Sequence, residues 1–156
     1  MSEEGNKELV RRFMEQAYQD VAGGDLDVLH QYFAEHYRNH TPFHPEQSGM
    51  QGMKEVIADL GRAMPDLRWE VLHSAADGDL VFVHVRATFT HEGQHRVTKH
   101  VRHVEPTGEE GTVSGVILYR VEGGKFAEGW YYLTLLEYAL AQSRGGAPTG
   151  GSEAPG

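Results

Sequence analysis

The stretch from residue 115 to residue 141 constrains the fold more than any other part of the chain. Its sequence, GVILYRVEGGKFAEGWYYLTLLEYALA, opens with a run that is predominantly apolar on both faces of a predicted strand. Gly123 and Gly124 follow, and adjacent glycines supply the positive φ angles that a tight turn requires. The aromatic-rich run 126–133 predicts a second strand. Because an isolated hairpin is only marginally stable, we expect further strands and a helical cover.

The first part of the chain predicts that helical cover. Three segments carry apolar residues at helical spacing: residues 7–21, 26–33 and 52–64. Gly23 and Gly24 are typical of a helix end, and Asp25 is typical of the N-cap of the next helix. Pro65 stops the last helix.

The middle of the chain predicts strands. They are expected at residues 67–75, 80–91 and 95–104. The second has a clear period of two, in which apolar residues alternate with His84, Arg86 and other side chains of the opposite face. We expect His84 and Arg86 on the convex surface or in a dimer contact. Residues 36–49 contain two prolines and few periodic apolar residues, which predicts a loop.

Helices followed by a meander of strands predict an α+β fold, in which three N-terminal helices close one face of a curved antiparallel sheet. Hydrophobic residues make up 39% of the chain and aromatic residues 10%, which is enough for a sizeable core. We expect one domain over residues 1–141. The Gly/Pro-rich segment 142–156 predicts a flexible tail.

Composition excludes several classes of function. The net charge of −9 argues against nucleic acid as the partner, since a phosphate backbone requires a concentrated positive face. The absence of cysteine excludes disulfides and thiolate chemistry. No signal segment or membrane-spanning apolar run is present, so we expect a soluble cytoplasmic protein without a membrane partner. The ten histidines are the groups that change charge most readily near neutral pH.

Several short segments, in order, resemble the SnoaL-like polyketide cyclase and ester cyclase family of the nuclear-transport-factor-like superfamily. They are NKELVRRF at 6–13, GDLD at 24–27, YRNH at 37–40, MPDLR at 64–68, GDLV at 78–81, THEG at 90–93, and YRVEGGK at 119–125 followed by Trp130. The resemblance implies a cone-shaped domain with a hydrophobic pocket between the helices and the concave sheet. It also implies a homodimer.

The resemblance further implies an intramolecular aldol ring closure that needs no metal or organic cofactor. Such a reaction requires a base that removes a proton α to a carbonyl, and a donor that stabilises the enolate. The family's carboxylate aligns with Tyr131 and its histidine with Ile117. A tyrosine, with an unperturbed pKa near 10, donates a hydrogen bond but is a poor base.

Three residues are the candidate catalytic groups: His40, His91 and Tyr131. His40 lies where the family places the pocket mouth, and it would exchange a proton near pH 7. His91 ends the apolar face of strand 80–91 and would lie at the pocket rim. Alternatively, both histidines flank turns and face solvent.

A second group of residues is expected to bind the substrate. Its members are Tyr37, Asn39, Trp69, Tyr119, Ile117 and Phe13. Tyr119 and Tyr131 are expected on the same side of the hairpin, where their hydroxyls would bind a carbonyl or phenol oxygen. The alternative is that the aromatic residues only pack the core and that Asn39 caps local backbone.

A metal site is not predicted. His36, His40 and His44 recur at intervals of four, but Pro42 and Pro45 make a helix unfavourable there, so the spacing does not place them on one face. The HExxH pattern and cysteine pairs are absent.

The leading functional hypothesis is a cofactor-independent cyclase-type enzyme that performs proton transfer or ring closure on a small hydrophobic, oxygenated, polyketide-like molecule. A dehydratase or isomerase on the same fold is the first alternative. The others are a non-catalytic small-molecule-binding accessory protein and a structural dimer that uses its convex sheet face.

Overall fold

The predicted C-terminal hairpin consists of β4 (Glu110–Glu122) and β5 (Lys125–Leu133). Gly123 and Gly124 form its turn with φ angles of 56° and 77°, which glycine adopts at little cost. The computed structural model describes residues 2–40, 49–93 and 106–134. The predicted strand 95–104 and the predicted tail 142–156 therefore lie outside the described residues.

The hairpin is the centre of a five-stranded sheet with the order β1-β5-β4-β3-β2. β2 (Arg68–Asp77) and β3 (Leu80–Thr90) follow the two predicted strands closely and pair antiparallel. In β3 the valines at 81, 83 and 85 are fully buried, whereas the alternating side chains His84 and Arg86 are exposed. The predicted period of two is confirmed.

The loop predicted for residues 36–49 is wrong over its first part. Residues 33–39 form β1 (Phe33–Asn39), which pairs parallel with β5, so the sheet is mixed rather than wholly antiparallel. Pairing with the free edge of β5 satisfies the backbone groups of this short segment, which has no strand periodicity of its own. Its Tyr37 is 1% exposed, so β1 also contributes to the core.

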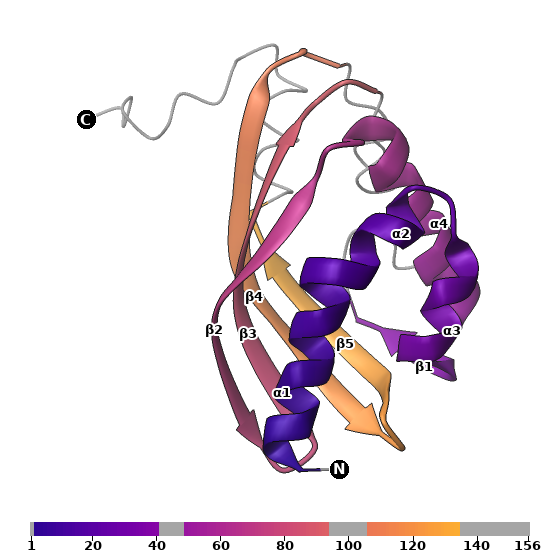
Figure 1. Ribbon diagram of the computed structural model, residues 1–156, viewed down its shortest axis with the longest axis vertical. Coiled ribbons are helices and arrows are strands. Elements are labelled where there is room, and N and C mark those ends of the chain that lie inside the picture. The colour runs from indigo at the N-terminus through magenta and orange to yellow at the C-terminus, as the bar shows by residue number, and fades with distance from the viewer. Residues whose placement is uncertain (1, 41–48, 94–105, 135–156) are drawn as a thin grey trace.

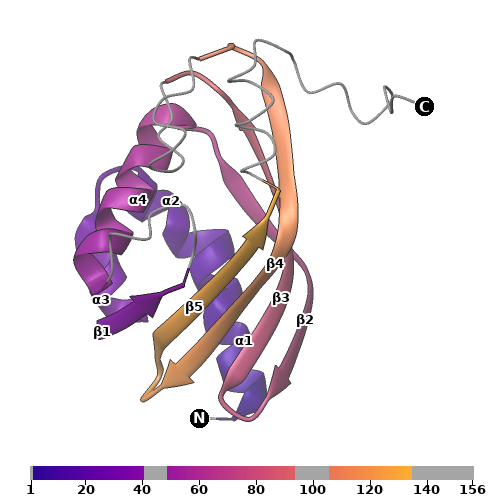
Figure 2. The same ribbon diagram turned by 180° about the vertical axis from the view of Figure 1, so that it is seen from behind.

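Helical segments precede and follow β1. The first runs through α1 (Glu3–Arg12), the π-helical turn η1 (Phe13–Ala17) and α2 (Tyr18–Ala22). The second is η2 (Leu26–Val28) with α3 (Leu29–Tyr32), and the third is α4 (Gly49–Ala63). Figures 1 and 2 show these segments on one side of the curved sheet. The predicted α+β architecture with three N-terminal helical regions is confirmed.

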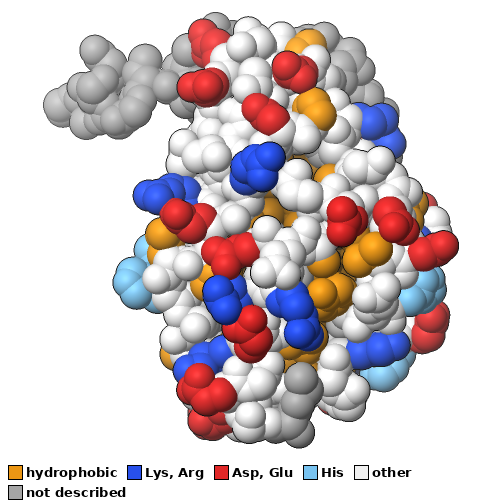
Figure 3. All heavy atoms as spheres, in the orientation of Figure 1, with side chains coloured by type: hydrophobic (Ala, Val, Ile, Leu, Met, Phe, Trp, Pro, Cys, Tyr) orange, Lys and Arg blue, Asp and Glu red, His pale blue; other side chains and the backbone are white. Residues whose placement is uncertain are grey.

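The face of the sheet that packs against the helices is called the inner face below, and the opposite face the outer face. The core lies between the inner face and α1, η1 and α4. None of the helices in the described part of the chain is long and apolar enough to span a bilayer. On the side of the molecule drawn in Figure 3, acidic and basic side chains of the described residues are interspersed and do not form a continuous basic surface.

Candidate functional site

Three tyrosine hydroxyls meet on the inner face of the sheet. The Tyr131 hydroxyl of β5 lies 2.8 Å from the Tyr37 hydroxyl of β1 and 3.0 Å from the Tyr119 hydroxyl of β4. The strand order explains this arrangement, because β5 runs between β1 and β4. We call Tyr37, Tyr119 and Tyr131 the tyrosine cluster.

A glycine makes room for the cluster. Gly129 pairs with Tyr119 and directly underlies the Tyr37 side chain. A Cβ atom at this position would overlap the Tyr37 hydroxyl and lie 3.2 Å from Cε1 of Tyr119. Any residue with a side chain at 129 would therefore displace the cluster.

The cluster stays protonated at neutral pH. Burial is the main cause that raises the pKa of Tyr37, Tyr119 and Tyr131 well above the ordinary value of 10, because an ionised phenolate loses its hydration. Three hydroxyls share two hydrogen bonds, so one O–H proton remains to be donated to another acceptor. The cluster is thus a neutral donor, suited to a carbonyl or enolate oxygen and unsuited to removing a proton.

Aromatic and aliphatic side chains surround the cluster. Phe126 stacks on Tyr119 with ring centroids 4.3 Å apart, and Phe13 packs edge-on against Phe126 at 5.7 Å. Ile117 is 1% exposed and pairs with Tyr131. The predicted residues Phe13, Ile117, Tyr37 and Tyr119 are therefore brought together with Tyr131. The low polarity around them strengthens hydrogen bonds made by the hydroxyls.

Trp69 lies on the inner face of β2, where it pairs with Ala87. Its ring is half-buried and meets the ring of Tyr18 edge-on, with centroids 6.0 Å apart. Asn39 points from β1 towards α4, where its Nδ2 lies 3.6 Å from Sδ of Met53. Both residues thus lie between the sheet and the helices, and their role in substrate binding stays a prediction.

His40 lies on the outer face of the sheet. Its Nε2 is 2.9 Å from Oε2 of Glu128, and its ring stacks on Trp130 at 4.6 Å. Glu128 and Trp130 alternate along β5 with Gly129 and Tyr131, so they point to the opposite side from the tyrosine cluster. The structure therefore does not bring His40 and Tyr131 to the same face.

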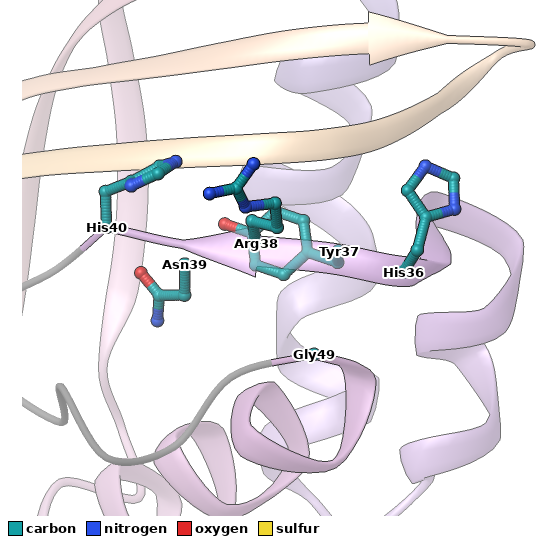
Figure 4. A pocket seen from close by; sticks show the side chains of 6 residues that line it. All are labelled: His36, Tyr37, Arg38, Asn39, His40 and Gly49. Atoms are coloured by element: carbon teal, nitrogen blue, oxygen red, sulfur yellow. The ribbon is translucent and has the colours of Figure 1, made fainter.

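The environment of His40 is polar. The second carboxylate oxygen of Glu128 accepts a hydrogen bond from Nε of Arg120 at 3.1 Å. The hydrogen bond with His40, followed by that with Arg120, lowers the pKa of Glu128. A surface hollow of about 430 Å³ adjoins β1; its lining residues are His36, Tyr37, Arg38, Asn39, His40 and Gly49. Figure 4 shows the His40 and Asn39 side chains leaving β1 in different directions.

His91 follows β3 on the inner face and is fully buried. Its backbone N–H donates to the Glu109 carbonyl, and the next residues donate to the Ala63 carbonyl at the end of α4. Tyr131, by contrast, pairs with Ile117, which pairs with Val83 early in β3. His91 and Tyr131 therefore share the inner face but lie at separate levels along it.

The other histidines singled out in the sequence do not converge. His36 is exposed and lies 3.4 Å from Oε2 of Glu122, while His44 lies outside the described residues. His84 faces His73 across the outer face with Nδ1 atoms 3.2 Å apart, and Arg86 pairs with Glu70. In the described ranges, no three histidine, aspartate or glutamate side chains are grouped to hold a metal ion.

Sequence reasoning overlooked Gly129, which makes room for the tyrosine cluster, and Glu128, which contacts His40. Glu128 and Trp130 are two residues apart in a strand, so they lie on the same face, and Tyr131 lies on the opposite one. This alternation is the signal that would have placed Glu128 and Tyr131 on different faces of β5. A glycine between bulky residues in a strand is itself a sign of close approach by another side chain.

Comparisons with known proteins agree with this architecture. The chain is similar to the SnoaL-like polyketide cyclase candidate of Jannaschia sp. CCS1, with 26% identity, a TM-score of 0.74, and coverage of 90% of this chain and 93% of that one. It also resembles a polyketide cyclase candidate of Acidithiobacillus ferrooxidans, with 23% identity, a TM-score of 0.72, and coverage of 92% and 99%. A third similar structure is AclR, a hydroxylase candidate from Streptomyces galilaeus, with 20% identity, a TM-score of 0.71, and coverage of 92% of this chain and 98% of that one. The last two likenesses establish the fold alone.

No curated protein sequence gives a significant match. The model of the SnoaL-like domain matches residues 10–129, which is most of the chain. The protein therefore belongs to the SnoaL-like family.

Proposed function

We propose that the protein is a cyclase-type enzyme that performs cofactor-independent proton transfer or aldol-type ring closure on a small hydrophobic, oxygenated, polyketide-like substrate. The observation that carries the proposal is the tyrosine cluster, a set of buried neutral hydroxyls with one donor proton unused. Its apolar surroundings suit a hydrophobic substrate. The similarity to the polyketide cyclase candidate of Jannaschia sp. CCS1 supports the same class of substrate.

In the proposed step, the substrate carbonyl oxygen accepts a hydrogen bond from the cluster. A base takes the proton from the adjacent carbon, and the electron pair of that C–H bond forms the enolate. The enolate carbon then attacks a second carbonyl carbon, and the new alkoxide oxygen takes up a proton. Donors fixed before the reaction stabilise the charge as it develops on oxygen, which is worth about 3–4 kcal/mol per donor in well-studied enzymes.

The cluster does not supply the base, since the pKa of each of its tyrosines is raised well above 10. Of the two predicted histidines, His91 has its side chain on the inner face. It lies eight residues beyond Val83, the β3 residue level with Tyr131, which is roughly 26 Å along the strand. His91 therefore does not reach the carbon next to a carbonyl held by the cluster, and the proposed step takes its base, a water molecule or hydroxide ion, from solvent. His40 is left out of the proposed step because it contacts Glu128 and Trp130 on the outer face.

The test uses exchange of the α protons of 1-phenylbutane-1,3-dione for deuterium, followed by NMR. Replacing Tyr131 by phenylalanine removes the central hydroxyl and is expected to lower the protein-catalysed rate by about 100- to 1,000-fold. Tyr132→Phe is the matched control, because Tyr132 is the next residue, points to the outer face and is 65% exposed. Equal rates for the two variants would refute the proposal.

A non-catalytic ligand-binding protein is the second candidate. The donor-only character of the cluster favours it, because hydroxyls held neutral bind an oxygen without moving a proton. This candidate predicts that the diketone binds and that Tyr131→Phe weakens binding, while the exchange rate equals that of buffer. A dehydratase or isomerase would instead retain catalysed exchange and give a different product, which the same NMR spectra identify.

A further inference from the structure

A second pair of polar groups lies in the interior beside the tyrosine cluster. The Tyr18 hydroxyl and the Trp69 indole nitrogen Nε1 are both shielded from solvent, and neither has a hydrogen-bond partner of normal geometry among the described residues. Their rings meet edge-on, with centroids 6.0 Å apart. Tyr18 belongs to α2 and Trp69 to β2, so the pair is formed where the first helical region crosses the inner face.

The pair is connected to the tyrosine cluster through packed rings. The ring of Phe13 packs edge-on against the rings of Tyr18 and Phe126, with centroid distances of 6.3 Å and 5.7 Å. The ring of Phe126 in turn stacks on that of Tyr119, with centroids 4.3 Å apart. The two sets of hydroxyls therefore belong to one interior region.

The number of donors in this region exceeds the number of acceptors in use. The Trp69 N–H faces the Tyr18 oxygen closely enough to oppose the rise in the pKa of Tyr18 that burial causes. If that contact tightens into a hydrogen bond, the Tyr18 O–H proton still has no acceptor. The cluster likewise keeps one unused proton. A buried donor without an acceptor is unfavourable, so each of these two protons is a place where a ligand oxygen would be stabilised.

We propose that Tyr18, supported by the Trp69 N–H, is a second binding point and that the site selects molecules carrying two acceptor oxygens. One oxygen is held by the tyrosine cluster and the other by the Tyr18 hydroxyl. This inference rests on the proposed function, because it takes the cluster to bind the first oxygen. Tyr18 would thereby determine which oxygenated molecules are accepted and in which orientation they lie.

The experiment compares two ketones of similar size by isothermal titration: 1-tetralone, with one carbonyl, and 1,4-naphthoquinone, with two. We expect the quinone to bind the wild-type protein about fivefold more tightly, as one added neutral hydrogen bond allows. Tyr18→Phe should abolish this preference and leave the affinity for 1-tetralone unchanged. Tyr131→Phe should weaken the binding of both ketones.

Tyr32→Phe is the matched control. Tyr32 packs on Phe13 with centroids 5.2 Å apart, so this variant also removes a core hydroxyl next to the same ring. Its hydroxyl is not one of the solvent-shielded polar atoms without a partner, and the preference for the quinone should persist. Thermal unfolding without ligand is the control for folding: Tyr18→Phe should unfold in one cooperative transition, so that a lost preference for the quinone reflects the missing hydroxyl.

The possible outcomes separate the two proposals. If Tyr131→Phe weakens the binding of both ketones but Tyr18→Phe retains the preference for the quinone, the second binding point is refuted and the proposed function stands. If Tyr131→Phe changes neither affinity, or neither ketone binds the wild-type protein up to its solubility limit, both proposals fail.

Discussion

Replacing Gly129 by alanine tests the packing of the tyrosine cluster directly. The φ angle of Gly129 is not in the positive region, so alanine is compatible with the backbone and the effect is steric. The added methyl group would overlap the Tyr37 hydroxyl and lie 3.1 Å from Cζ of Tyr37. The Tyr37 side chain must therefore move, which breaks its 2.8 Å hydrogen bond to Tyr131.

The expected destabilisation follows from three contributions. Overpacking a core costs about 1–3 kcal/mol, and losing a neutral hydrogen bond costs about 1 kcal/mol. The lower conformational entropy of the unfolded alanine chain offsets about 0.4–1 kcal/mol. We expect Gly129→Ala to lower the free energy of unfolding by about 1–3 kcal/mol, measured by urea denaturation at pH 7. It should also reduce catalysed α-proton exchange, since the donor geometry is disturbed.

The double variant with Tyr37→Phe separates the steric cause from a general intolerance of alanine. Phenylalanine lacks the hydroxyl that the methyl group overlaps, so the second substitution should recover part of the stability lost by Gly129→Ala. Recovery should be partial, because Cζ of residue 37 stays close to the new methyl group. If the two substitutions destabilise additively, the hydroxyl is not the group in conflict and this reasoning is wrong.

Three further predictions use other parts of the molecule. The raised pKa of Tyr119 contributes stability that is present below pH 10 and lost as the pH rises towards its pKa in the folded state. The free energy of unfolding should therefore fall less steeply with pH above pH 10 for Tyr119→Phe than for the wild type, as urea titrations would measure. The Asp66 carboxylate accepts hydrogen bonds from the Thr90 N–H at 2.7 Å and from the Thr90 hydroxyl at 2.8 Å. These bonds lower the pKa of Asp66, and the bond from the N–H has the larger effect. The contribution of Asp66 to stability is present above pH 4 and lost as the pH falls further, so Asp66→Asn should reduce the stability difference between pH 7 and pH 3 in urea titrations. If the protein is the predicted homodimer and pairs through its outer face, Phe82→Glu should give monomers in sedimentation equilibrium, because Phe82 is 40% exposed there; an unchanged dimer would exclude this part of the face.

Local patterns were sufficient for the elements whose own residues bury one face. The alternation in β3, the glycine turn at 123 and 124 and the apolar spacing of α4 each appear in the sequence and in the structure. In these segments the periodicity of the chain and the periodicity of burial coincide, because each strand or helix is covered on one side only. The order of the elements along the chain then determined the α+β class.

β1 could not be read from its own residues. Its strand conformation depends on parallel pairing with β5, which is distant in sequence. The apolar residues of β1 do not alternate, so the segment before Pro42 resembles a loop. The same long-range pairing determines the site. Tyr37 reaches Tyr131 only because β1 occupies the free edge of β5, and His40 is turned to the outer face by the parity of the same strand.

The sequence by itself thus determined the inventory of helices and strands and the residues able to donate or accept a proton. Only the tertiary structure decided which of these residues meet. Strand order and parity are set by backbone pairing between segments far apart in the chain, and no local pattern encodes that pairing. A cluster of three hydroxyls from three strands, with a glycine between them, is a consequence of that pairing.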